Sequence, residues 1–100
     1  MGYINNKKLE EGRPYVFEYP DVSFMGILEL KTSYWTHKEC KVGVYINLTT
    51  GGHGVNSKFY NYNTVREPTV NELAYYREMI ESKKEIPFKN YKTESDYEVF

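Results

Sequence analysis

The sequence predicts an α+β protein that is mostly β, a small antiparallel SH3-like or OB-like barrel or curled sheet with one C-terminal helix over about residues 70–84. Two observations lead to this class. Short stretches of alternating apolar residues, separated by turn and glycine signals, fill the chain from Arg13 to Val65. After Pro68 the apolar period changes to that of a helix.

The length of 100 residues fits a single domain. We expect this domain to span residues 13–88, after an arm over 1–12 and before a tail or edge strand over 89–100. Thirteen basic and fourteen acidic residues give a formal net charge of -1, so no global field attracts nucleic acid or an anionic membrane. Cys40 is the only cysteine, and neither a secretory signal nor a membrane-spanning run is evident, which predicts a cytoplasmic protein.

The first two strands are predicted between Arg13 and Leu30. Alternating aromatic residues mark the first strand: Tyr15, Phe17 and Tyr19. A turn is expected at Pro20-Asp21. In the second strand, Met25 and Ile27 lie opposite an apolar face, which predicts burial on both sides, and Gly26 predicts a bulge or bend.

Two further strands are predicted around a glycine-rich stretch. Residues 31–40 are expected to form a loop with a short strand. Lys41–Leu48 gives the clearest strand pattern, with four aliphatic residues expected on one face: Val42, Val44, Ile46 and Leu48. Lys58–Val65 alternates again and predicts the next strand.

The stretch between these strands, TTGGHGVNS at residues 49–57, places three glycines around His53. A phosphate-binding loop needs backbone amides aimed at an anion, commonly at a helix N-terminus, and neither G-x-G-x-x-G nor a Walker spacing is present. We therefore predict a hairpin loop. The spacing of His37, Cys40 and His53 matches no zinc pattern. A catalytic pair of Cys40 with His53 or His37 is conceivable, but isolated side chains explain these residues better, so we predict no metal, no cofactor and no enzyme activity.

A helix is predicted from Val70, because Thr69 occupies an N-cap position and Glu72 follows three residues later as in a capping box. At about 100° per residue, one arc is expected to pack on the sheet: Val70, Leu73, Ala74, Arg77 and Ile80, flanked by Tyr76. Tyr75 and Met79 fall on the opposite, exposed side. Together with Trp35, they are the candidate protein contacts.

A second candidate surface combines tyrosines with a cation: Tyr45, Lys58, Tyr60 and Tyr62. On a small barrel, such a face could stack the bases of single-stranded nucleic acid while the cation neutralises phosphate. Cross-strand tyrosine pairing explains the same pattern without a ligand. The near-neutral charge favours that structural explanation.

Two stretches resemble small uncharacterised proteins of bacteriophages and prophages: LEEGRPYVFEYPD at residues 9–21 and VREPTVNELAYYREMI at residues 65–80. In those proteins the first leads into a barrel and the second supplies a closing helix. The resemblance spans roughly residues 9–82. It implies a small accessory protein of a mobile element that acts on a host protein, and it assigns no functional residue.

Compact size, near-neutral charge and eleven tyrosines favour a protein-binding accessory module whose partner the sequence does not identify. The alternative is a single-stranded nucleic-acid-binding barrel that uses the tyrosine and lysine face. The two hypotheses differ in whether oligonucleotide binding is detected and weakens with salt.

Overall fold

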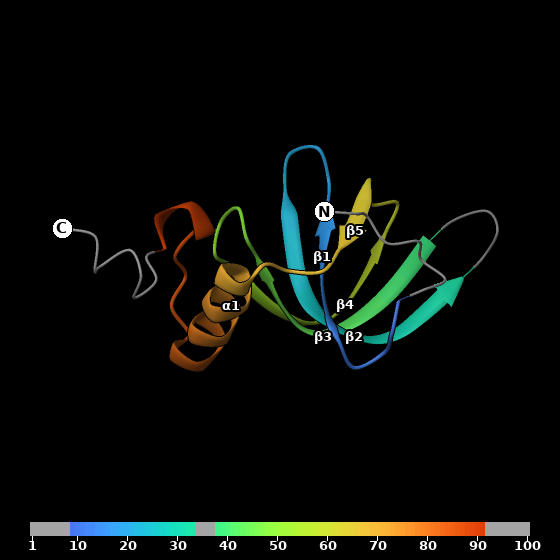
Figure 1. The fold of residues 1–100 in the computed structure, drawn as a ribbon, viewed down its shortest axis with the longest axis horizontal. Helices are drawn as coiled ribbons and strands as arrows, with labels where there is room; N and C mark the ends of the chain where they lie inside the picture. Colours follow the sequence, from blue (N-terminus) through green and yellow to red (C-terminus); the bar gives the residue numbers. More distant parts are fainter. Residues whose placement is uncertain (1–8, 34–37, 92–100) are drawn as a thin grey trace.

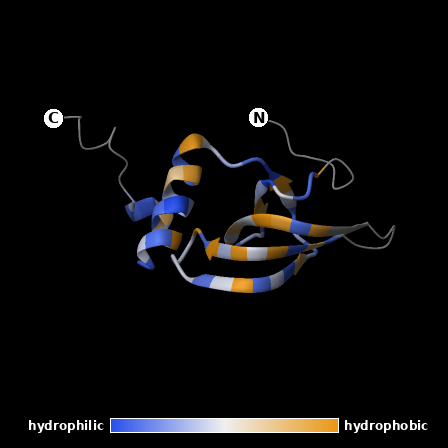
Figure 2. Cartoon of the chain, turned by 90° about the horizontal axis from the view of Figure 1, so that it is seen from below, coloured by the Kyte–Doolittle hydropathy of each residue, from blue (hydrophilic) through white to orange (hydrophobic). Residues whose placement is uncertain are grey.

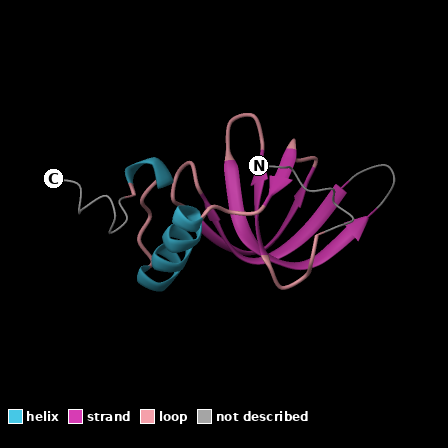
Figure 3. Ribbon diagram, viewed as in Figure 1, coloured by secondary structure: helices cyan, strands magenta, loops and turns pink. Residues whose placement is uncertain are grey.

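The computed structural model describes residues 9–33 and 38–91. Five strands form one antiparallel sheet in the order β4-β3-β2-β1-β5, with α1 beside it (Figures 1 and 3). The elements are β1 (Pro14–Glu18), β2 (Ser23–Ser33), β3 (Lys38–Asn47), β4 (His53–Tyr60), β5 (Thr64–Arg66), α1 (Val70–Ser82) and the 3-10 helix η2 (Phe88–Asn90). The predicted class, α+β and mostly β, is confirmed. Within the described ranges, neither helix is long and apolar enough to traverse a lipid bilayer.

The sheet curls into an open trough and does not close into a barrel. β4 and β5 occupy opposite edges of the sheet, yet only residues 61–63 join them. Four strand spacings in a flat sheet would separate these edges by about 19 Å, whereas the connection can span at most about 14 Å. The strands therefore bend toward one another, as Figure 1 shows. β1 to β4 form a simple meander, unlike the Greek key of an OB-fold.

Hydrogen bonds fasten the crossing between β4 and β5 to the C-terminal end of β1. The Tyr19 hydroxyl donates to the Tyr60 carbonyl at 2.8 Å. The amide of Asn63 donates to the carbonyl of Glu18, also at 2.8 Å. At the same end of β1, the Tyr19 amide donates to the Val22 carbonyl, so the predicted turn at Pro20-Asp21 is confirmed.

Each face of the sheet carries its own apolar cluster. The trough interior contains Leu9, Tyr15, Phe17, Leu28, Cys40, Val42, Phe59, Tyr62 and Val65. The outer face, beneath α1, contains Val16, Met25, Ile46, Leu48, Tyr75 and Met79. Neighbouring residues of β2 contribute to different clusters, so the prediction that this strand is buried on both sides is confirmed.

The pairing of β2 with β3 shifts immediately after Gly26, which confirms the predicted bulge or bend. Between the pairs Gly26–Tyr45 and Leu28–Val42, β3 has one residue more than β2. The extra residue reverses the side to which the following β3 side chains point. Val42 consequently lies inside the trough and Ile46 lies under α1.

The single aliphatic face predicted for residues 41–48 is therefore wrong. Val44, which that prediction buried, is 38% exposed. Tyr45, which the prediction placed on the opposite face, packs against the trough cluster instead.

The element boundaries differ from the prediction at several places. The strand predicted over residues 58–65 is not continuous, because β4 ends at Tyr60 and β5 begins at Thr64. Most of residues 31–40 are strand, because β2 extends to Ser33 and β3 begins at Lys38. Leu9 is buried in the trough and the Gly12 amide donates to the Leu28 carbonyl at 2.7 Å, so residues 9–12 belong to the domain and not to an arm. Tyr91 packs on the cluster beneath α1, so the domain also extends past residue 88.

The predicted capping box of α1 is present, but the predicted orientation of the helix is wrong. The Thr69 hydroxyl accepts the Glu72 amide, and the Glu72 carboxylate accepts the Thr69 amide. Tyr75 and Met79 are completely buried, whereas Val70 is 81% exposed. Figure 2 shows that hydrophobic and hydrophilic residues alternate along the helix.

Candidate functional site

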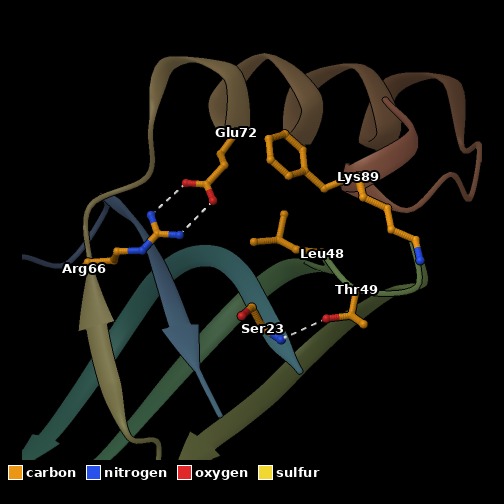
Figure 4. A pocket seen from close by; sticks show the side chains of 7 residues that line it. Ser23, Leu48, Thr49, Arg66, Glu72 and Lys89 are labelled. Atoms are coloured by element: carbon orange, nitrogen blue, oxygen red, sulfur yellow. Dashed lines mark hydrogen bonds and ion pairs between the residues drawn. The ribbon is translucent and has the colours of Figure 1, made fainter. Parts of the chain in front are cut away.

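A buried network of charged groups joins the N-terminus of α1 to β5 and β1. Arg66 donates from its two terminal nitrogens to the two oxygens of Glu72, each at 2.8 Å (Figure 4). The Nε atom of Arg66 lies 3.4 Å from the Glu18 carboxylate, which also accepts the Thr64 hydroxyl at 2.7 Å. This network gives Arg66 two carboxylate partners from different elements.

The network keeps Glu72 ionised although the side chain is buried. Burial alone would raise the pKa of Glu72, but hydrogen bonds from Arg66 and the Thr69 amide outweigh burial and hold the pKa below its ordinary value. The hydrogen bonds to Glu72 in turn raise the pKa of Arg66. Both carboxylate oxygens of Glu72 therefore accept hydrogen bonds that hold α1 to the sheet.

A pocket of about 300 Å³ opens beside this network (Figure 4). Its lining consists of Ser23, Leu48, Thr49, Arg66, Glu72, Phe88 and Lys89. The polar groups within it bind mainly one another: Arg66 pairs with Glu72, and the Ser23 amide donates to the Thr49 hydroxyl at 3.3 Å. An exposed Lys89 stands at one side. The pocket therefore offers few polar groups to a ligand.

A second hollow of about 300 Å³ lies between α1 and the first two strands. We call it the α1 groove, and its lining is Pro14, Ile27, Leu73, Tyr76, Arg77, Ile80 and Glu81. Leu73, Tyr76 and Ile80 recur at i, i+3 and i+7 on one flank of the helix, so their side chains line up along the groove. The Tyr76 hydroxyl donates to the Val44 carbonyl at 2.7 Å and anchors this flank to β3.

A third hollow, of about 350 Å³, lies at the start of β4. We call it the β4 hollow, and its lining is Val44, His53, Gly54, Val55, Ile80, Lys83 and Glu85. Val55 is 64% exposed and pairs with the partly exposed Val44 across the strands. The Nε2 atom of His53 is buried and lacks a hydrogen-bond partner among the described residues. Ile80 lines both this hollow and the α1 groove, so the two hollows adjoin.

The predicted tyrosine face is not assembled as one surface. Tyr62 is only 4% exposed, and its hydroxyl lies 3.4 Å from the Cys40 sulfur inside the trough. Tyr45 packs edge to face on Phe59, also inside the trough. Of the three tyrosines, Tyr60 alone is well exposed, at 57%. These residues therefore do not provide the stacking platform that the sequence suggested.

Lys58, the cation of that predicted face, is exposed and lies 4.0 Å from the Glu39 carboxylate. An exposed ion pair of this length contributes little to stability. The nearby carboxylate also reduces the positive potential that a phosphate would encounter. Lys58 lies opposite the exposed Lys41 in the pairing of β3 with β4, so two lysines and one carboxylate meet at this part of the sheet.

The glycine-rich stretch forms a hairpin loop, as predicted, although the loop is shorter than expected. Gly51 adopts a φ of 86°, and its amide donates to the Asn47 carbonyl, so the loop between the paired residues Asn47 and Gly52 has four residues, 48–51, and ends in the left-handed glycine. The Asn47 side chain accepts the amides of Thr49 and Thr50. His53 lies not in this loop but at the first position of β4.

Cys40 and His53 lie on opposite faces of the sheet, since Cys40 is buried in the trough and His53 lines the β4 hollow. His37 lies outside the described residues. In residues 9–33 and 38–91, no three His, Cys, Asp or Glu side chains gather as a metal site would require.

The candidate protein contacts need correction. Tyr75 and Met79 are core residues, and the Tyr75 hydroxyl donates to the Ile86 carbonyl. Burial raises the pKa of Tyr75 to about 12. Trp35 lies outside the described residues. Besides the exposed Val70, the large apolar residues of α1 that remain partly accessible are Leu73, Tyr76 and Ile80 of the α1 groove, which the sequence had assigned to the side that packs on the sheet.

No protein-family model, curated protein or solved structure matches this chain.

Proposed function

We propose that this protein is a small protein-binding accessory module and that the α1 groove receives an apolar side chain of its partner. The observation that carries the proposal is the flank of α1 formed by Leu73, Tyr76 and Ile80. These residues are only partly buried and line an open hollow, although the core under the helix is already filled by Tyr75 and Met79.

The chemistry of the α1 groove supports a protein partner. Most of its lining is aliphatic or aromatic and partly buried, while Arg77 and Glu81, one of each charge, are the exposed residues of the helix that line it. An apolar centre with a polar border is typical of protein interfaces, where a buried side chain anchors the complex and the border excludes water. The adjoining β4 hollow extends the accessible apolar surface toward Val55.

Because residues 9–82 resemble bacteriophage and prophage proteins, we expect the partner to come from a bacterial host. We propose that the protein acts in the cytoplasm of a bacterial host on a host protein. The near-neutral net charge agrees with a partner recognised by shape and apolar contact more than by long-range attraction.

The test compares Ile80→Glu, inside the α1 groove, with Val70→Glu on the exposed side of the same helix. Each protein is immobilised, and host proteins captured from an extract are quantified by mass spectrometry. We expect wild type and Val70→Glu to enrich the same protein, and Ile80→Glu to lose at least about tenfold, equivalent to about 1.4 kcal/mol.

Thermal unfolding followed by circular dichroism establishes that each variant is folded. Equal enrichment by folded Ile80→Glu and wild type would exclude the α1 groove as the binding surface. Failure of wild type to enrich any host protein over a blank support would count against the protein-binding function itself.

A further inference from the structure

β4 is an edge strand of the described sheet, and its first residues present unused backbone groups. The Asn47 amide donates to the Gly52 carbonyl at 2.7 Å, so this pair is a hydrogen-bonded one. In an antiparallel ladder, hydrogen-bonded and non-hydrogen-bonded pairs alternate. His53 and Val55 consequently belong to non-hydrogen-bonded pairs with β3, and their N–H and C=O groups point toward the open edge.

The usable length of this edge is short and well defined. On one side it is limited by the hairpin loop, which ends at Gly51 with a φ of 86°. On the other side it is limited by Asn56, which has a φ of 54° and interrupts the regular strand. Irregularities of this kind stop edge strands from pairing over a long distance. Regular pairing is therefore available over His53–Val55 only.

This three-residue segment is complementary to itself. When two copies pair antiparallel about Gly54, His53 of each copy lies opposite Val55 of the other. All outward backbone groups of both residues are then used in four hydrogen bonds. Centring the pair on His53 would bring Val55 opposite Gly51, and centring it on Val55 would require pairing beyond Asn56. The register about Gly54 is the one that uses regular strand in both copies.

The side chains favour the same partner. His53 and Val55 both line the β4 hollow, so each copy would place Val55 beside His53 of the second copy and cover an exposed valine. The hollow carries one cation and one anion, Lys83 and Glu85, so a two-fold arrangement brings equal numbers of both signs together. A net charge of -1 per chain adds little repulsion between copies.

We propose that two copies of this chain associate through β4, in antiparallel register about Gly54, to form one continuous sheet. The interface depends on the β4 edge and not on binding of another protein in the α1 groove. Because the paired segment is only three residues long, we expect a concentration-dependent dimer with a Kd of about 10–100 μM.

Sedimentation velocity tests this proposal on the full chain from about 5 to about 500 μM, a range that brackets the expected Kd. Val55→Lys places a charge on the edge, as natural edge strands do to prevent pairing. The matched control Val70→Lys makes the same change on the exposed side of α1. We expect wild type and Val70→Lys to become dimeric with the same concentration dependence, and Val55→Lys to associate at least about tenfold more weakly.

Amide hydrogen exchange of wild type identifies the surface without any substitution. We expect the amides of His53 and Val55 to gain protection as concentration rises, because only pairing to a second copy hydrogen-bonds them. The proposal is overturned by a monomer at every concentration, by equal weakening in both lysine variants, or by a dimer in which these two amides exchange as fast as in dilute protein.

Discussion

Replacing Glu72 by Gln tests the buried network that fixes α1 to the sheet. Glu72 accepts two hydrogen bonds from Arg66 and one from the Thr69 amide. Glutamine keeps the size of the side chain and one carbonyl oxygen, so it can still cap the helix. It removes the negative charge, and its amide group donates where a carboxylate oxygen accepted.

The expected loss follows from the surroundings of Arg66. Removing one partner of a buried ion pair costs about 3–5 kcal/mol because the other charge is left uncompensated. Here the Arg66 side chain is 13% exposed and keeps the Glu18 carboxylate at 3.4 Å. We therefore expect the free energy of unfolding at neutral pH to fall by about 2–3 kcal/mol, at or below the low end of that range.

The loss should depend on pH in a defined direction. The folded-state pKa of Glu72 lies below its ordinary value. Its stabilising contribution is therefore complete above the unfolded pKa of about 4.3 and is lost as the pH falls through the lower folded value. Wild type and Glu72→Gln should differ most near neutral pH and converge in acid.

Urea unfolding followed by circular dichroism, at about pH 7 and about pH 3, measures both effects. The control is Glu81→Gln, an exposed glutamate on the same helix, whose change should stay within about 0.5 kcal/mol. A Glu72→Gln loss as small as that of the control would refute the role given to the network. A loss of the same size at both pH values would refute the assignment of the effect to the carboxylate charge.

Two further predictions concern the helix face and the tyrosines. In urea unfolding, Met79→Ala should cost about 2–5 kcal/mol and Val70→Ala less than about 0.5 kcal/mol, and similar losses at both positions would contradict the orientation of α1. Fluorescence anisotropy with mixed-sequence single-stranded DNA and RNA should detect no binding up to about 100 μM at physiological salt, because Tyr62 is buried and Tyr45 is packed inside the trough. Saturable binding that weakens with added salt would favour the nucleic-acid alternative instead.

Features that depend on neighbouring residues were predictable from the sequence. The turn at Pro20-Asp21, the irregularity after Gly26, the glycine-rich hairpin and the capping box of Thr69 and Glu72 all follow from local backbone preferences and local hydrogen bonds. Alternation of apolar residues likewise identified β1 and most of β2 and β3, because the side-chain period of a strand is a property of the chain itself, but it joined the end of β4 to β5 as one strand.

The surfaces on which function depends were decided by contacts between distant residues. Tyr75 and Met79 became core because the pairing of Glu72 with Arg66 of β5 turns that side of α1 toward the sheet. The pattern of polar and apolar residues in the sequence cannot reveal this orientation of α1, because a glutamate such as Glu72 is assigned to the surface unless its buried partner is known.

The same reasoning applies to the sheet. The extra β3 residue opposite β2 moved Tyr45 into the trough, and the curl that brings β4 toward β5 buried Tyr62 beside Cys40. Sequence alternation assigns residues to two faces of a strand. It does not say where a bulge exchanges those faces or which face a curled sheet encloses, because both depend on pairing between strands that are distant in the chain.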